Sequence, residues 1–175
     1  MEIGNDFNTL TAWVQPRHLS ASGIAEYRAN FESRPLRVLH MTDFLQPDMA
    51  ARIARFLGRE ASYEKMYALY ETDGSEKRVA ADVWREADKD SRYYSLGELI
   101  GPDPRFRLSP NLFTFLNFRK MLATSAFRAY VSAITGLPLE GLVKRAVHHM
   151  RRGDILGPQD DRFRGRRLAF VFGSR

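Results

Sequence analysis

The chain has 175 residues, of which 44% are hydrophobic and 12% aromatic, and it contains no cysteine. This composition predicts one folded domain of ordinary size and excludes disordered and fibrous proteins. The lack of cysteine excludes disulfides, thiolate metal sites and a cysteine nucleophile. No apolar run approaches the roughly 18 residues that cross a bilayer, and Met1–Leu10 lacks the basic residues of a signal peptide. The sequence therefore predicts a soluble, cytoplasmic protein without a membrane partner.

The net charge of +6 is unevenly distributed along the chain. Residues 1–140 contain 18 basic and 18 acidic residues, whereas residues 141–175 contain nine basic and three acidic ones. A basic terminal segment is typical of proteins that bind nucleic acid or another polyanion. However, the aromatic side chains of this segment are few, and Phe170 and Phe172 alternate onto one face of a predicted strand, as core residues do. Nucleic acid is therefore not an expected partner.

The predicted elements begin with a strand over residues 36–41, which are β-leaning. Pro47 then stands where a helix can begin, and Gly58 supplies a natural stop. Between them, apolar side chains recur at the spacing of one helical face: Met49, Ile53, Phe56 and Leu57. The tyrosine-rich segment 62–71 fits either a helix or a strand, and its pattern leaves both open.

Two helices are predicted in the middle of the chain. Residues 101–110 hold three prolines and are expected to form a loop. Residues 111–123 predict the first helix, and Thr124 or Ser125 is expected to cap the second. The apolar face of the second helix comprises Phe127, Tyr130, Val131 and Ile134. Gly136 is expected to end this helix.

The last part of the chain predicts strands. Residues 143–150 and 167–172 are rich in β-forming side chains. Residues 151–153 predict a turn, because Gly153 takes a positive φ without strain. Neither a nucleophile elbow of the form G-x-S-x-G nor a glycine-rich phosphate loop occurs in the sequence.

The most informative stretch runs from residue 148 to residue 172. It contains HHMRRGDILGPQDD and, after a short gap, GRRLAFVF. Together with MTDFL at residues 41–45, it resembles the iron(II)- and 2-oxoglutarate-dependent oxygenases, specifically the prolyl-hydroxylase-like branch. In that branch a strand of the form M/Y-x-x-G-D-x-L leads into His-x-Asp, and an R-R-L-x-F-V strand follows. The resemblance covers residues 36–172.

The resemblance implies an α+β fold in which N-terminal helices pack on an incomplete double-stranded β-helix, or jelly roll. It also implies Fe(II) and 2-oxoglutarate as cofactors, hydroxylation as the reaction, and a protein or peptide side chain as the substrate. Non-haem Fe(II) is held by two imidazoles and one carboxylate, which leave positions open for 2-oxoglutarate and O₂. A spacing of two residues suits two ligands, because alternate residues of an extended chain point the same way.

The sequence departs from the family pattern at three places. Gln159 stands where the family has its first histidine, and Asp161 keeps the carboxylate position. The amide oxygen of Gln159 is a much poorer ligand for Fe(II) than an imidazole. No histidine follows Asp161, and the late-strand Arg or Lys that binds 2-oxoglutarate in the family is missing as well. His148 and His149 are expected to be ordinary strand residues, because alternation sends them to opposite faces.

These observations predict a single truncated oxygenase-like domain over residues 1–175. Residues 1–140 are its helical and strand support region, and residues 141–175 start the barrel. The first hypothesis for function is a truncated or degenerate dioxygenase that is inactive alone. The second is a non-catalytic half-barrel subunit that pairs through an exposed edge strand with a complementary oxygenase chain or with itself. The third and weakest is a polyanion-binding module.

Overall fold

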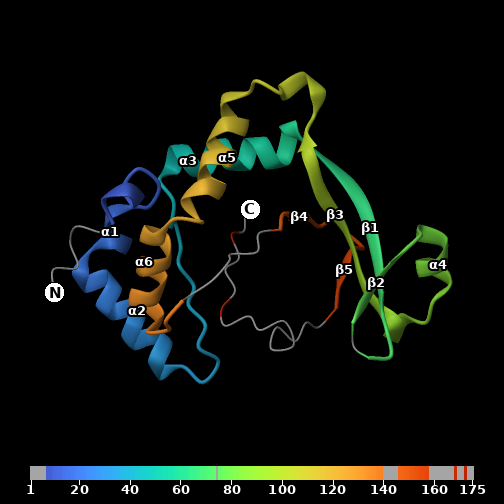
Figure 1. Cartoon of the computed structure of the whole chain (residues 1–175), viewed down its shortest axis with the longest axis horizontal. Helices are drawn as coiled ribbons and strands as arrows, with labels where there is room; N and C mark the ends of the chain where they lie inside the picture. Colours follow the sequence, from blue (N-terminus) through green and yellow to red (C-terminus); the bar gives the residue numbers. More distant parts are fainter. Residues whose placement is uncertain (1–6, 74, 140–145, 158–167, 169–171, 173–175) are drawn as a thin grey trace. The chain divides into compact units, whose positions relative to one another are not determined.

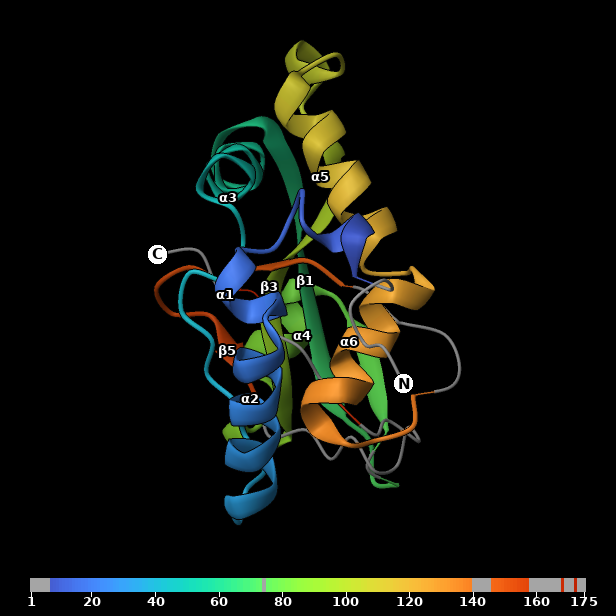
Figure 2. The same ribbon diagram turned by 90° about the vertical axis from the view of Figure 1, so that its left-hand side faces the viewer.

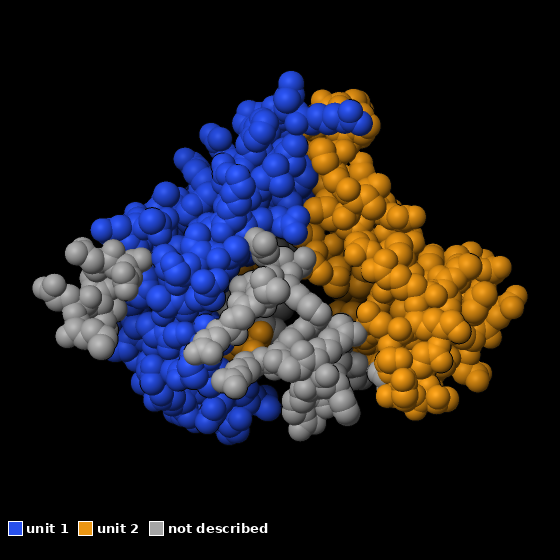
Figure 3. Space-filling view, viewed as in Figure 1, with its two compact units in different colours: residues 1–59, 107–144 blue, residues 60–106, 145–175 orange. Residues whose placement is uncertain are grey.

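The structure is a computed structural model (Figure 1), and it describes residues 7–73, 75–139, 146–157, 168 and 172. It divides the chain into two compact units, which Figure 3 colours separately. Unit 1 comprises residues 1–59 and 107–144, and unit 2 comprises residues 60–106 and 145–175. Each unit therefore combines two stretches that are far apart in the sequence.

Unit 1 is helical. Its described helices are α1 (Pro16–Leu19), α2 (Ala21–Ser33), α3 (Pro47–Arg55), α5 (Pro110–Met121) and α6 (Ser125–Thr135). Helix α2 packs on α6, and α3 packs on α5 (Figures 1 and 2). Aromatic rings fill the spaces between these helices: Phe56 stacks on Phe115 with centroids 4.9 Å apart, and Phe7 meets Tyr130 edge-on at 5.8 Å.

The ends of α6 follow the sequence signals and confirm the predictions, whereas α5 begins at Pro110 and ends at Met121, compared with the predicted range 111–123. The side chain of Thr124 accepts a hydrogen bond from the amide of Phe127 at 3.1 Å, which caps α6. Gly136 ends α6 with a φ of 73°, in the left-handed region that favours glycine. The predicted apolar face of α6 is buried. Helix α3 begins at Pro47, also as predicted, and continues into a π-helical turn, Phe56–Glu60, that contains Gly58.

The strand predicted over residues 36–41 is wrong. This segment contains neither helix nor strand, and Arg37 within it has a φ of 47°. Leu36 is 85% exposed and Val38 is 56% exposed, so neither finds the half-buried surface that favours a strand. Extended pairing instead occurs slightly later, where Leu45 forms an antiparallel bridge with Val14.

Unit 2 contains an open antiparallel sheet. Its strands are β1 (Ala61–Tyr70), β2 (Glu76–Val79), β3 (Arg92–Pro102), β4 (His148–His149) and β5 (Ile155–Leu156). The strand order is β2-β1-β3-β4, and β5 also pairs with β3. Helix α4 (Ala81–Glu86) lies against β1, where the ring centroids of Trp84 and Tyr67 are 5.4 Å apart. The tyrosine-rich segment that fitted helix or strand is therefore strand β1.

Helices combined with an open antiparallel sheet give the α+β class that the sequence predicts. The central strand β3 is absent from the sequence prediction, because Gly97 and Glu98 interrupt its apolar pattern. Of the strand predicted over residues 143–150, the described part is extended only at β4. Most of the strand predicted over residues 167–172 lies outside the described residues. Within the described part of the chain, no helix has the length and apolar character needed to cross a membrane.

Candidate functional site

Strands β4 and β5 form one strand that a loop interrupts. Both run antiparallel to β3, with His149 opposite Gly97 and Ile155 opposite Ser95. On β3 only Leu96 separates the two positions, whereas residues 150–154 separate them on the other side. The extra residues are not paired with β3 and form an enlarged bulge in this strand. Gly153 turns this bulge with a φ of 90°, as predicted for residues 151–153.

Asp154 closes the bulge and ties it to β1. Its side chain is 9% exposed. The Oδ1 atom accepts a hydrogen bond from Lys65 Nζ, and Oδ2 accepts one from the backbone amide of Arg151 at 2.8 Å. Burial by itself raises the pKa of Asp154, but the two hydrogen bonds and the charges of Lys65 and Arg151 hold that pKa below its usual value. Asp154 is therefore a carboxylate with a structural task.

The same face of the sheet brings Tyr63 against His149. Their ring centroids are 4.8 Å apart, and burial raises the pKa of the Tyr63 hydroxyl. Gly97 makes this packing possible, because a Cβ there would lie 3.2 Å from the His149 carbonyl oxygen and 3.3 Å from Tyr63 Cβ. His148, the residue before it on β4, pairs with Glu98 and is exposed. The two histidines thus serve the sheet as separate strand residues.

The described chain is anchored to the sheet at Gly157, two residues before the first position of the predicted metal motif. The amide of Gly157 donates to the Tyr93 carbonyl at 2.6 Å. A Cβ at Gly157 would lie 2.5 Å from the Tyr70 hydroxyl, so any larger residue would push against β1. The motif positions Gln159 and Asp161 lie outside the described residues.

The side chains of the motif do not fit the iron site that the resemblance implies. Such a site needs two imidazoles and one carboxylate, whereas Gln159 and Asp161 supply one amide and one carboxylate. The ring of His149 lies against Tyr63 instead. Among the residues that the structure describes, no three His, Asp or Glu side chains gather closely enough to hold a metal ion. The donor set of the motif, an amide and a carboxylate, is therefore not that of a dedicated Fe(II) site.

Unit 1 holds a second polar cluster, which the sequence did not indicate. His18 is 2% exposed, and its ring bonds to Tyr27 on one side and to the MTDFL segment on the other. Nδ1 lies 2.6 Å from the Tyr27 hydroxyl, and Nε2 lies 3.1 Å from the Asp43 carbonyl oxygen. Arg17 Nη2 also donates to the Thr42 carbonyl at 2.8 Å. A lone histidine in a mixed segment gives no sequence signal for such a contact.

Both ring nitrogens of His18 are engaged. Nδ1 pairs with the Tyr27 hydroxyl, and Nε2 faces both the Asp43 carbonyl oxygen and the donating Nε of Arg17, which is 3.2 Å away. Burial lowers the pKa of His18, the Arg17 charge lowers it further, and the nearby carbonyls oppose the change. The ring joins α1 and α2 to Asp43, whose φ is 49°.

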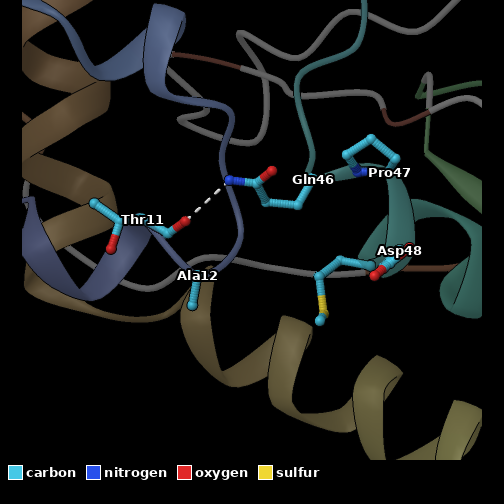
Figure 4. A pocket seen from close by; sticks show the side chains of 6 residues that line it. Thr11, Ala12, Gln46, Pro47 and Asp48 are labelled. Atoms are coloured by element: carbon cyan, nitrogen blue, oxygen red, sulfur yellow. Dashed lines mark hydrogen bonds between the residues drawn. The ribbon is translucent and has the colours of Figure 1, made fainter.

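Unit 1 also has an open pocket of about 440 Å³ (Figure 4). Its lining consists of Thr11, Ala12, Gln46, Pro47, Asp48 and Met49. Gln46 Nε2 donates to the Thr11 carbonyl at 3.2 Å across it. Asp48 is the one ionisable side chain of this lining, so the pocket offers neither an acid–base pair nor a metal-ligand set.

Compared with known proteins, the chain matches no family model, no curated protein and no solved structure.

Proposed function

We propose that residues 36–172 form the opening part of an oxygenase-type domain of the iron(II)/2-oxoglutarate class, and that this chain alone is catalytically inactive. One observation carries the proposal. The M-x-x-G-D-x-L sequence forms a bulge that Asp154 ties to the sheet, and Gln159 and Asp161 follow five and seven residues after Asp154. A metal motif needs such support, because ligand side chains must be held to within a fraction of an ångström.

The inactive state follows from the residue at position 159. An amide oxygen is neutral and binds Fe(II) weakly, so Asp161 is left as the one strong ligand of the motif. The chain would keep the scaffold of the family without its metal chemistry. A role in binding a peptide or a second subunit then replaces turnover.

Metal titration of full-length variants tests the proposal. Q159H creates the His-x-Asp pair and should bind Mn(II) or Fe(II) under argon at least about tenfold more tightly than the natural chain, a gain of about 1.4 kcal/mol. N117H is the matched control, because it adds a histidine on the exposed side of α5. Adding Asp161→Ala to Q159H should abolish the gain. If Q159H binds no better than N117H, position 159 is not a ligand position and the oxygenase assignment fails.

A second candidate is the half-barrel subunit, and the exposure of β5 favours it. Ile155 is 39% exposed and Leu156 is 43% exposed, although both belong to a strand at the margin of the described sheet. Apolar side chains on such a strand invite pairing with another chain. Light scattering should show a dimer or a complex, and L156K should dissociate it. The control V83K changes a 48% exposed site on α4 and should leave the assembly intact. A monomer at all concentrations, with no co-purifying partner, would exclude this role.

A further inference from the structure

The fold regroups the charges of the chain in a way that the linear sequence hides. The described part of unit 1, residues 7–59 and 107–139, contains eleven Lys and Arg residues against four Asp and Glu, a balance of +7. Residues 60–106 of unit 2 contain seven against eleven, a balance of −4. Together with Glu2, Asp6 and Glu140, these values sum to zero over residues 1–140, so the linear sequence hides the basic character of unit 1. Unit 1 is therefore a strongly basic body, independently of the terminal segment.

Most of this excess belongs to the helix pair α3/α5, which we define as residues 47–59 and 107–123. These 30 residues contain six basic side chains and one acidic one, a balance of +5. The two helices are held together by the stack of Phe56 on Phe115. The basic side chains thus belong to one packed substructure with a rigid aromatic centre.

Four of the six cations of the pair are exposed and available. They are Arg52, Arg59, Arg107 and Lys120. Within the described residues, none of these four side chains takes part in an ion pair. Arg52 belongs to α3, and Arg59 belongs to the π-helical turn that continues it.

The outer side of α5 is apolar as well as basic. Phe113 is 50% exposed, and Lys120 follows it seven residues later on the same side of the helix. The buried side of α5 is also apolar, with Leu112, Phe115, Phe118 and Met121. Phe113 therefore presents an accessible aromatic ring on the same side of α5 as Lys120, and a base can stack on such a ring.

We infer that the helix pair α3/α5 binds single-stranded nucleic acid through the phosphate backbone, with Phe113 as a stacking platform for a base. Ten of the eleven cations in the described part of unit 1 are arginines, and the guanidinium fork matches the oxygens of a phosphate group. Cations beside an exposed aromatic ring are the combination that binds single strands without sequence preference. The inference rests on unit 1 and does not depend on the proposed function.

Fluorescence anisotropy with labelled dT20 and U20 tests this binding. Four phosphate contacts predict a slope of about −3 in log affinity against log salt, since each contact contributes about −0.7 on a single strand. The triple variant R52Q/R59Q/K120Q should lower the affinity at least tenfold and make the slope shallower by about 2. F113A should lower the affinity about fivefold to a hundredfold, the range for losing one base stack.

Matched variants distinguish binding by the helix pair from a general effect of the protein's net charge. K77Q/R85Q/K89Q removes three exposed cations from unit 2 and should change the affinity less than threefold. R162Q/R164Q/R166Q removes three from the basic terminal segment and should also leave most of the binding intact. Circular dichroism and melting curves verify that every variant is folded.

Several results would overturn the inference. It fails if either control triple weakens binding as much as the helix-pair triple, or if F113A has no effect. It also fails if poly-glutamate competes as well as the oligonucleotide, which would indicate an acidic protein partner. Binding to anionic lipid vesicles without binding to dT20 or U20 would assign the surface to lipid, since Leu108 and Leu116 are exposed on the same pair.

Discussion

Replacing Lys65 by Met should destabilise the protein more than replacing Asp154 by Asn. K65M leaves a carboxylate that is only 9% exposed without its cation, at a cost of about 2–4 kcal/mol. D154N leaves Lys65, which is 38% exposed and remains hydrated. The Asn side chain still accepts from the Arg151 amide, so its cost is about 1–2 kcal/mol. The double variant should lose less than the sum, with a coupling of about 1–2 kcal/mol.

Urea unfolding at pH 7 measures the cycle, and its pH dependence gives a second readout. The pKa of Asp154 is depressed in the folded state, so its contribution is complete above the unfolded pKa of about 3.9 and disappears as pH falls through the folded pKa. The difference between natural chain and D154N should therefore be constant from pH 7 to about pH 5 and shrink below about pH 4.

The exposed pair of Arg105 and Asp103 is the control for this cycle. Its side chains are 78% and 27% exposed, so R105M and D103N should show much weaker coupling than K65M and D154N. The account of the bulge is refuted if K65M costs no more than D154N. It is also refuted if the two changes add to within about 0.3 kcal/mol.

Three further predictions concern unit 1. Burial lowers the pKa of His18, so the folded state binds fewer protons than the unfolded state, and stability should fall as pH drops below about 6.5. Thermal melts from pH 8 to pH 5 should show this decrease in stability in the natural chain and a smaller decrease in H18Q. Equal decreases in the two proteins would contradict the prediction. G136A should cost more than about 1 kcal/mol, because the residue has a φ of 73° and its Cβ would lie 2.6 Å from the Arg28 guanidinium. G58A, where a Cβ meets nothing within 4 Å, should cost less, and urea unfolding of both variants checks the order. T124A should cost about 1 kcal/mol through the lost cap of α6, and T124S should restore most of it; a T124A loss that T124S does not recover would argue against capping.

Local sequence signals were sufficient for α3, α5 and α6 of unit 1, whereas α1 and α2 were not predicted. The prediction of α6 rested on Thr124 at its start, Gly136 at its end and a buried apolar face, and all three act within one or two turns. The strand predicted over residues 36–41 failed because its apolar residues have no partner to pack on. Strand β3 was missed for the opposite reason. The strand forms because it pairs with its neighbours β1 and β4, whereas its own sequence, which contains Gly97 and Glu98, does not predict a strand.

In the candidate site too, local features were predictable from the sequence and contacts between distant residues were not. The turn at Gly153 was predictable from a glycine in a short loop. The tie between Asp154 and Lys65 was not, because 89 residues separate them in the chain. The contact of His18 with the Asp43 carbonyl, 25 residues away, was equally inaccessible. The charge of unit 1 could not be read from the sequence, because it emerges only when residues 7–59 and 107–139 are counted together.

The central claim is that the chain has an oxygenase scaffold without a working iron site. The direct measurement is succinate production by the purified chain with Fe(II), ascorbate, 2-oxoglutarate and O₂, accompanied by an anaerobic Fe(II) titration. The account predicts no succinate above a heat-denatured control and no stoichiometric binding of iron. One Fe(II) bound per chain together with catalytic succinate formation would contradict it.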